Sequence, residues 1–312
     1  MSARTRPPEI PRTAETFDAA DGKRRVHLTN LQKPFWKSPT VTKGDLLRYY
    51  AAISPWLLPH VRDRAMVMKR YPNGASGEFF FMKHVPDSHP AWLSTCKIKH
   101  AGGRIVEFPM VNDLASLLWI VNLGCIDLNQ WYACCDDPNR PDYFHFDLDP
   151  VPGATFERVC ETALAVHDAL ERLEMPNFAK TTGSRGIHIY VPIKRGPLQK
   201  DVWTFSKALA MQIAERSPQL ITAVYAKAKR PHGRVLIDYN QNAWGRTLAS
   251  IYSVRAAKRP TVSAPVTWRE LEKGVRLDDF DIGNMVARLR KVGDLWKPLL
   301  ARTGRVDLAK YL

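Results

Sequence analysis

The sequence lacks the short signatures that most directly identify a metal or nucleotide site. Its five cysteines, Cys96, Cys125, Cys134, Cys135 and Cys160, form no Cys-x-x-Cys pair and have no histidines at a zinc-type spacing. Neither a Walker A loop nor a G-x-G-x-x-G dinucleotide fingerprint occurs. These absences argue against a zinc module and against both types of phosphate loop, and we expect the cysteines to be reduced, mostly buried thiols.

Long apolar runs are missing as well. The longest, residues 114–126, is too short to span a bilayer and contains Asn122, so it predicts a core helix, capped by Asn112. Residues 1–16 are rich in Arg, Pro and Thr and have no apolar signal-peptide segment. We therefore expect a cytoplasmic protein with a loose N-terminal tail and no membrane partner.

The chain has more positive than negative charge. Lys and Arg number 46 against 31 Asp and Glu, which gives a formal net charge of +15 over 312 residues. A surface of this kind attracts polyanions, and nucleic acid is the leading candidate, although a generally basic protein is an open alternative. Hydrophobic residues make up 45% of the chain, enough for one large domain or two closely packed lobes.

Strand-like and helix-like segments alternate along the chain. The alternation is typical of an α/β or α+β domain. A capping-box pattern in Thr42 and Asp45 precedes a helix predicted over residues 43–56. Further helices are predicted over residues 155–173 and 200–216, and strands over residues 25–29, 65–70 and 78–83.

The first chemical motif is YFHFDLDP, residues 143–150. With a period of two, Phe144, Phe146 and Leu148 point to one side of a strand, whereas His145, Asp147 and Asp149 point to the other. The two carboxylates therefore share a face, where their repulsion favours a divalent cation. A strand that ends in a solvated turn is the alternative that this stretch alone leaves open.

The second motif is TTGSRGIHIYVP, residues 181–192. Gly183 and Gly186 allow a close backbone approach, so free N–H groups with Ser184, Arg185 and His188 could hold a phosphate chain. A hairpin turn with a hydrogen-bonded core histidine explains the same stretch equally well.

The third motif, RVLIDYNQN at residues 234–242, places Asp238 at the end of another apolar strand. Added to Asp147 and Asp149, it makes a three-carboxylate set that could bind two divalent ions for displacement at phosphorus. Arg246 and Arg255 downstream are either counter-charges for a triphosphate or solvated surface cations.

These motifs, in this order and at these separations, resemble those of the archaeo-eukaryotic primase superfamily, and most closely the polymerase domain of bacterial ligase D. Further matching stretches are LTNLQK, TKGDLLRYY, MKRYPNG, FFFMK and IYSVR. The resemblance covers roughly residues 26–298. It implies an α+β primase-polymerase fold with a central mixed or antiparallel sheet flanked by helices, over residues 23–300, with a flexible tail at 1–22 and another at 301–312.

The resemblance also implies roles for individual residues. Asp147, Asp149 and Asp238 would be catalytic and would hold two Mg²⁺ or Mn²⁺ ions. The nucleotide would be bound by Thr182, Ser184, Arg185, His188, Gln241 and Arg255. The 5′-phosphate at the downstream edge of a gap would be bound by Asn30, Lys33 and Lys43. Lys69, Arg70, Phe80 and Phe81 would contact DNA and template, although composition alone favours core phenylalanines and solvated lysines.

One position departs from the family pattern. Where ligase D polymerase domains often read Glu-Leu-His-Pro-Trp, residues 127–131 read Asp-Leu-Asn-Gln-Trp, so no histidine role passes to Asn129. No KxDG ligase motif occurs either, so the resemblance implies a stand-alone relative that works with a separate DNA ligase.

The expected function is template-dependent addition of nucleotides, preferably ribonucleotides, at gaps or breaks in DNA during repair. The expected partners are gapped or broken DNA with a downstream 5′-phosphate and nucleoside triphosphates, in the nucleoid of the cytoplasm. Two other functions stay open. One is a DxD phosphohydrolase, which Pro150 after the second Asp disfavours. The other is a non-catalytic nucleic-acid-binding module, which the intact acids disfavour.

Overall fold

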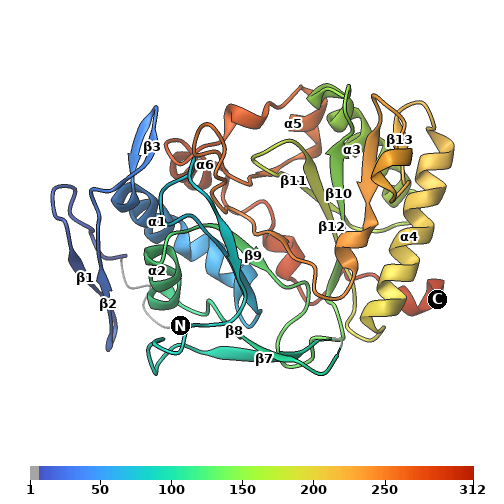
Figure 1. The fold of residues 1–312 in the computed structure, drawn as a ribbon. Coiled ribbons are helices and arrows are strands. Elements are labelled where there is room, and N and C mark those ends of the chain that lie inside the picture. The colour runs from blue at the N-terminus through green and yellow to red at the C-terminus, as the bar shows by residue number, and fades with distance from the viewer. Residues whose placement is uncertain (1–6, 101) are drawn as a thin grey trace. The chain divides into compact units, whose positions relative to one another are not determined.

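The chain folds into two compact units. A computed structural model describes residues 7–100 and 102–312 (Figure 1). Unit 1 comprises Met1–Gln130, Ala249–Val262 and Asp281–Gly293, and unit 2 comprises Trp131–Leu248, Ser263–Phe280 and Asp294–Leu312. Each unit therefore collects segments that are distant in the sequence.

Unit 1 combines small antiparallel sheets with helices. Its elements are β1 (Phe17–Asp21), β2 (Arg24–Leu28), β3 (Pro34–Lys37), β4 (Thr40–Thr42), α1 (Lys43–Val61), β5 (Met66–Arg70), β6 (Phe80–Met82), β7 (Thr95–Lys99), β8 (Ile105–Pro109), α2 (Leu114–Asn122), β9 (Cys125–Gln130) and α6 (Met285–Val292). β5 lies between β9 and β6, and β1–β2, β3–β4 and β7–β8 are antiparallel pairs. Helix α1 packs against α2 and α6.

Strand β1 lies within the segment 1–22, which the sequence assigns to a tail. Residues 1–6 of that segment are outside the described part of the chain.

The capping patterns explain where the helices of unit 1 begin. The predicted box of Thr42 and Asp45 is present at the start of α1, which continues to Val61, five residues beyond the predicted end. The prediction for α2 was wrong in its cap: Asp113, not Asn112, accepts from the Ser116 N–H at 2.8 Å. The helix then stops at Asn122, because Gly124 adopts a left-handed φ of 82° and turns the chain into β9.

Unit 2 is built around a six-stranded sheet. Its elements are β10 (Tyr143–Pro150), α3 (Phe156–Glu171), β11 (Phe178–Thr181), β12 (Ile187–Pro192), α4 (Gln199–Arg216), β13 (Ile221–Thr222), β14 (Val235–Asp238), β16 (Pro265–Val266) and α5 (Trp268–Glu272), and β15 (Leu248–Ala249) lies at the unit boundary. The strand order is β13-β14-β10-β12-β11-β16. All neighbours are antiparallel except β13 and β14, so the predicted mixed sheet within an α+β fold is confirmed.

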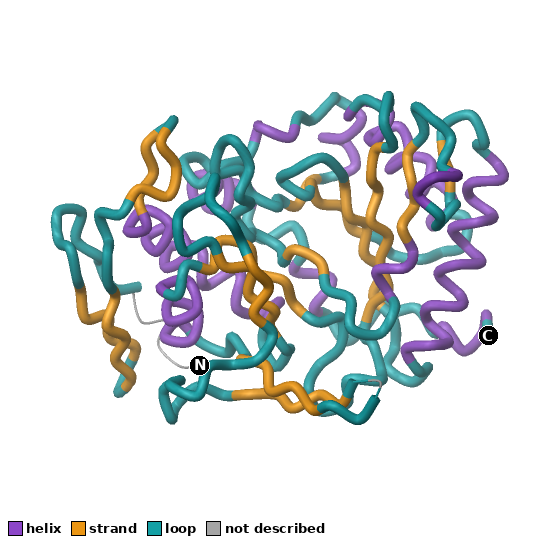
Figure 2. The backbone as a smooth tube through the Cα atoms, viewed as in Figure 1, coloured by secondary structure: helices purple, strands orange, loops and turns teal. Residues whose placement is uncertain are grey.

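The two faces of β10 have different surroundings, as its alternating pattern predicts. Phe144, Phe146 and Leu148 are fully buried, and the Phe144 ring lies 5.5 Å from that of Phe205 on α4. Helices α3 and α4 both pack on this sheet, and α4 is the long purple helix beside it in Figure 2. Burial of each large apolar side chain contributes about 1.5–3 kcal/mol. The polar residues of β10 therefore point to the face opposite these helices.

The cysteines differ partly from the expectation. Cys125, Cys134 and Cys160 are free, as predicted, but Cys96 and Cys135 are disulfide-bonded. Spacing along the chain gives no information on such a bond, because it depends on tertiary proximity. Across residues 7–100 and 102–312, no helix has the length and apolar character needed to cross a membrane.

Candidate active site

The site in unit 2 is a row of polar residues across four neighbouring strands. Asp147 on β10 lies directly opposite Asp238 on β14 and opposite His188 on β12. His188 in turn lies opposite Lys180 on β11. Because directly opposed residues in antiparallel strands point to the same face, these four side chains form one continuous line, and Asp149 lies on the same face of β10.

The carboxylates of Asp147, Asp149 and Asp238 are close enough to repel one another. The charge of Asp147, followed by burial, raises the pKa of Asp149 to about 7, and Asp238 adds to this effect. Arg185 and Arg230 act in the opposite direction on the Asp149 pKa. Arg230 is a cation that the sequence motifs did not identify, and its Nε donates to the Val224 carbonyl at 3.1 Å.

The donor set suits a hard divalent cation. Carboxylate oxygens are the preferred ligands of Mg²⁺ and Mn²⁺, and a cation would relieve the repulsion that raises the Asp149 pKa. In the described part of the chain, no three His, Cys, Asp or Glu side chains already converge on one point. The two oxygens of Asp238 accept from the Asn240 N–H at 2.9 Å and from Gln241 Nε2 at 2.8 Å. A carboxylate has further lone pairs, so these contacts leave it able to bind a cation.

The glycine-containing turn approaches β10 closely. A Cβ on Gly186 would lie 2.2 Å from the Leu148 carbonyl oxygen, so only glycine fits at this position. The N–H groups of Ser184, Arg185 and Gly186 donate to Thr182 Oγ1 at 3.2, 3.2 and 3.0 Å. The expectation that these N–H groups are free for a phosphate is therefore wrong in this structure, because the Thr182 hydroxyl already organises the turn.

The predicted nucleotide-binding residues are divided between the units. Thr182, Ser184, Arg185, His188 and Gln241 all lie in unit 2. Arg255 lies in unit 1, where its Nε donates to buried Asp127 at 3.3 Å. Lys69 Nζ is 3.7 Å from the same carboxylate. At the position that departs from the family pattern, Asn129 Nδ2 donates to the Asp127 carbonyl at 3.1 Å.

The three residues predicted to bind a 5′-phosphate are close together in unit 1. The Lys33 N–H donates to the Asn30 carbonyl, and the Lys43 N–H donates to the Lys33 carbonyl at 2.9 Å. Lys43 Nζ donates to the Thr29 carbonyl at 2.7 Å. Burial, with the nearby positive charges of Lys33 and Arg70, lowers the pKa of Lys43 to about 8. These cations crowd one another at the N-terminus of α1, which suits an anion as ligand.

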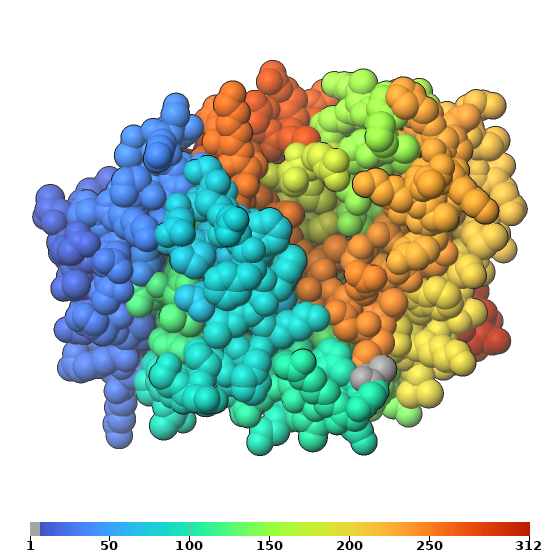
Figure 3. Space-filling model, viewed as in Figure 1, coloured from blue at the N-terminus to red at the C-terminus, as the bar shows by residue number. Residues whose placement is uncertain are grey.

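Three phenylalanines of unit 1 are exposed to solvent. Phe79, Phe80 and Phe81 have exposed fractions of 50%, 45% and 56%, and their segment lies at the surface, in cyan in Figure 3. The register of β5 and β6 places Lys69 opposite Phe81 and Arg70 opposite Phe80. Lys69 Nζ lies 3.9 Å from the centre of the Phe79 ring, and the Arg70 guanidinium 5.2 Å from that of Phe80. The phenylalanines are thus surface rings with adjacent cations, not core residues.

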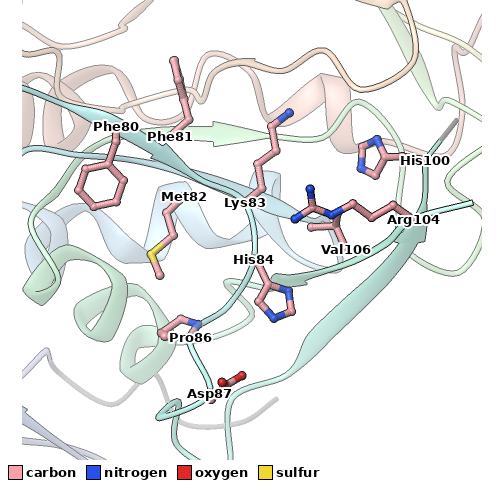
Figure 4. A pocket seen from close by; sticks show the side chains of 10 residues that line it. All are labelled: Phe80, Phe81, Met82, Lys83, His84, Pro86, Asp87, His100, Arg104 and Val106. Carbon is pink, nitrogen blue, oxygen red and sulfur yellow. The ribbon is translucent and has the colours of Figure 1, made fainter. Parts of the chain in front are cut away.

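A pocket of about 800 Å³ adjoins these rings. Figure 4 shows the side chains of Lys83, His100 and Arg104 gathered on one side of it, with Phe80 and Phe81 on the other. Burial and the charges of Lys83 and Arg104 lower the pKa of His100. The sequence motifs did not identify His100 or Arg104, because basic residues outside a motif are indistinguishable from an ordinary solvated surface.

Known proteins resemble this chain over most of its length. The family model for the LigD primase-polymerase domain matches residues 42–296. The polymerase domain of Mycobacterium tuberculosis ligase D, solved in complex with DNA, has 30% sequence identity and a TM-score of 0.84, with 90% of this chain and 99% of that chain covered.

Two curated relatives are longer end-joining proteins. The multifunctional non-homologous end joining protein LigD of Mycolicibacterium smegmatis is 33% identical over 88% of this chain. The bifunctional non-homologous end joining protein LigD of Bacillus subtilis is 27% identical over 86% of this chain. The chain spans only 36% and 43% of the lengths of these two relatives.

The matching family model and fold place the chain in the class of primase-polymerase domains. Within that class, the chain belongs to the LigD primase-polymerase domain family.

Proposed function

We propose that this protein adds nucleotides to the 3′ end of a primer at short gaps or breaks in DNA, under the direction of the template. The observation that carries the proposal is the carboxylate pair Asp147 and Asp238 on adjacent strands, with Asp149 on the same face. These three residues would hold two Mg²⁺ or Mn²⁺ ions, which when bound lower the pKa of the primer hydroxyl and neutralise charge on the triphosphate.

The turn, together with His188 and Gln241, would form the binding site of the nucleoside triphosphate. Arg185 and Ser184 are exposed beside the carboxylates, so they can contact an incoming phosphate group. His188 Nε2 lies 3.2 Å from Asp147 Oδ1 and can hold that carboxylate in place. Thr182 would act by shaping the turn, and Gln241 by positioning Asp238. We assign Arg255 to the same triphosphate on the family resemblance.

Unit 1 would bind the nucleic acid around the reacting end. The cluster of Asn30, Lys33 and Lys43 has the charge and donors to hold a terminal 5′-phosphate downstream of a gap. Phe80 and Phe81 are exposed rings on which unpaired template bases can stack, with Lys69 and Arg70 supplying positive charge for the backbone.

The relatives suggest a biological setting. Their names place LigD proteins in non-homologous end joining. We infer that this chain serves DNA repair, in end joining or in excision-repair gap filling, with a separate DNA ligase that seals the product and in association with the cytoplasmic nucleoid.

The sugar preference follows from the same reasoning. We expect ATP to be incorporated faster than dATP opposite a template thymine, because the resemblance to ligase D polymerase domains implies a ribonucleotide preference. The measurement is competition between the two nucleotides in a one-nucleotide gap, resolved by product mobility. Equal or faster dATP incorporation would contradict the preference, and incorporation of neither nucleotide would contradict polymerase activity itself.

The binding of a 5′-phosphate should weaken as pH rises through about 8. Lys43 has its pKa lowered to about 8, so at pH 9 it is mostly neutral and attracts the phosphate less. The ratio of affinities for 5′-phosphorylated and 5′-hydroxyl gaps should fall by up to about tenfold between pH 7 and pH 9. Fluorescence anisotropy titrations measure both affinities. Lys43→Arg keeps its charge over this range and should show no such fall, and a ratio that stays constant in the wild type would count against Lys43 as a phosphate ligand.

The alternative functions give different results in one assay. A phosphohydrolase would release phosphate from a nucleotide or a DNA end without extending the primer. A non-catalytic module would bind the gap and do neither. The three clustered acids repel one another, which raises the Asp149 pKa to about 7. This repulsion is unfavourable in the folded protein, and a module that only binds nucleic acid has no use for it.

A further inference from the structure

The row of polar residues in unit 2 continues past the carboxylates to a buried lysine. Lys180 on β11 has no exposed surface, and its Nζ lies 2.7 Å from His188 Nδ1 and 2.6 Å from Ser263 Oγ. Its Nζ is also 5.9 Å from the centre of the Trp296 ring. An apolar side chain would fill this space without the cost of burying an ammonium group, so core packing alone does not explain Lys180.

When Lys180 is an ammonium group, the hydrogen bonds along this row have one consistent direction. The Ser263 hydroxyl donates to the Thr181 carbonyl at 3.0 Å, so its oxygen is left to accept from Lys180. An ammonium group has three donors and no acceptor, so Lys180 also donates to His188 Nδ1. Nδ1 must therefore be without hydrogen, and the ring hydrogen lies on Nε2.

The hydrogen on Nε2 faces the catalytic carboxylate. His188 Nε2 is 3.2 Å from Asp147 Oδ1, and the two side chains are only 3% and 11% exposed. In the tautomer that Lys180 selects, the Nε2–H faces the Asp147 carboxylate at this distance and attracts it electrostatically. With the opposite tautomer, Nε2 would present a lone pair to a carboxylate, and the two groups would repel each other.

We propose that Lys180 is a positioning residue for nucleotidyl transfer: it fixes His188 as an Nε2–H donor that orients Asp147. The inference rests on the proposed function for its effect on rate, whereas the tautomer itself is a property of the resting protein. In this proposal Lys180 acts on Asp147 through His188. Replacing a residue that orients the ligands of a metal site typically lowers activity or metal affinity by about 10–100-fold.

The tautomer is tested directly in the wild-type protein. With ¹⁵N-labelled histidine, long-range ¹H–¹⁵N spectra distinguish ring nitrogens that carry hydrogen from those that do not, and His188→Gln identifies the His188 signals by their loss. We expect a bare Nδ1 and a protonated Nε2 at neutral pH. A hydrogen on Nδ1, in the neutral or the doubly protonated ring, would overturn the proposal. This readout needs no enzymatic activity, so it is independent of the proposed function.

The effect on the reaction is tested with Lys180→Met, which keeps the length of the side chain and removes the donor. We expect kcat for single-nucleotide incorporation, per active site, to fall by about 10–100-fold, with KM for the nucleotide and the affinity for gapped DNA changed by less than about threefold. The His188 spectrum should change in the same variant. Lys180→Arg, which retains donors, should recover part of the rate.

Controls separate positioning from folding. Lys200→Met removes an exposed lysine at the start of α4 in the same unit and should leave kcat and the His188 spectrum unchanged. The positioning role is wrong if Lys180→Met folds and has a normal kcat. It is also wrong if KM for the nucleotide and the affinity for gapped DNA worsen as much as kcat falls. If Lys180→Met does not fold, the wild-type spectrum still decides the tautomer. If the wild type incorporates no nucleotide, the proposed function fails while the spectrum still decides the tautomer.

Discussion

Replacing Asp147 or Asp149 with alanine should reduce nucleotide incorporation by about three orders of magnitude or more, while gapped-DNA binding persists. Each substitution removes a ligand from the point where negative charge accumulates during transfer. The nucleic-acid contacts that we propose lie in unit 1, on other segments of the chain, so binding and chemistry should separate. Extension of a labelled primer measures the first quantity, and anisotropy with the same gapped DNA measures the second.

A matched substitution controls for the loss of a carboxylate in unit 2. Asp168 lies exposed on α3, on an element that packs on the sheet, and Asp168→Ala should extend the primer at the wild-type rate. Near-normal extension by the Asp147 and Asp149 variants with both Mg²⁺ and Mn²⁺ would show that the metal assignment is wrong.

Replacing Lys33 and Lys43 together with alanine should weaken binding to 5′-phosphorylated gaps by about two orders of magnitude or more. Each charge-assisted contact to a phosphate contributes about 1.5–3 kcal/mol, and every 1.4 kcal/mol corresponds to about a tenfold change in affinity. Gaps that end in a 5′-hydroxyl should lose far less affinity. Titration of both gaps at one fixed ionic strength gives the comparison.

The control pair for this experiment is Lys23 and Lys37, two exposed lysines of the same unit. Their replacement removes the same total charge and should weaken binding to both gaps alike, through the general salt-dependent attraction. Because Lys43 is buried and donates to the Thr29 carbonyl, thermal unfolding of the Lys33 and Lys43 variant must be measured alongside. Equal losses on the two DNA ends would reduce this cluster to a generic cationic surface.

Local patterns predicted the parts of the site that depend on one strand or one turn. The period-two alternation of YFHFDLDP placed Asp147 and Asp149 on a face opposite the buried phenylalanines, and β10 has this arrangement. The capping box of Thr42 and Asp45 likewise located the start of α1. Both signals lie within a few residues, so the sequence contains all that determines them.

Features that depend on register between strands were not predictable. Lys180 lies opposite His188 only because β11 and β12 pair in one register, and nothing near Lys180 in the sequence distinguishes it from an exposed lysine. The exposure of Phe79, Phe80 and Phe81 was not predictable from composition either. Composition favours a core position for phenylalanine, whereas the structure exposes all three rings. The disulfide-bonded state of Cys96 and Cys135 is also a tertiary property.

The most direct test of the account is single-nucleotide incorporation into a one-nucleotide DNA gap, with each of the four template bases and each of the four labelled ribonucleotides in turn. The account predicts that every template base directs incorporation of its complementary nucleotide well above the other three, that a downstream 5′-phosphate increases the yield, and that Asp147→Ala gives no product. Incorporation that does not depend on the template base, or phosphate release without primer extension, would contradict it.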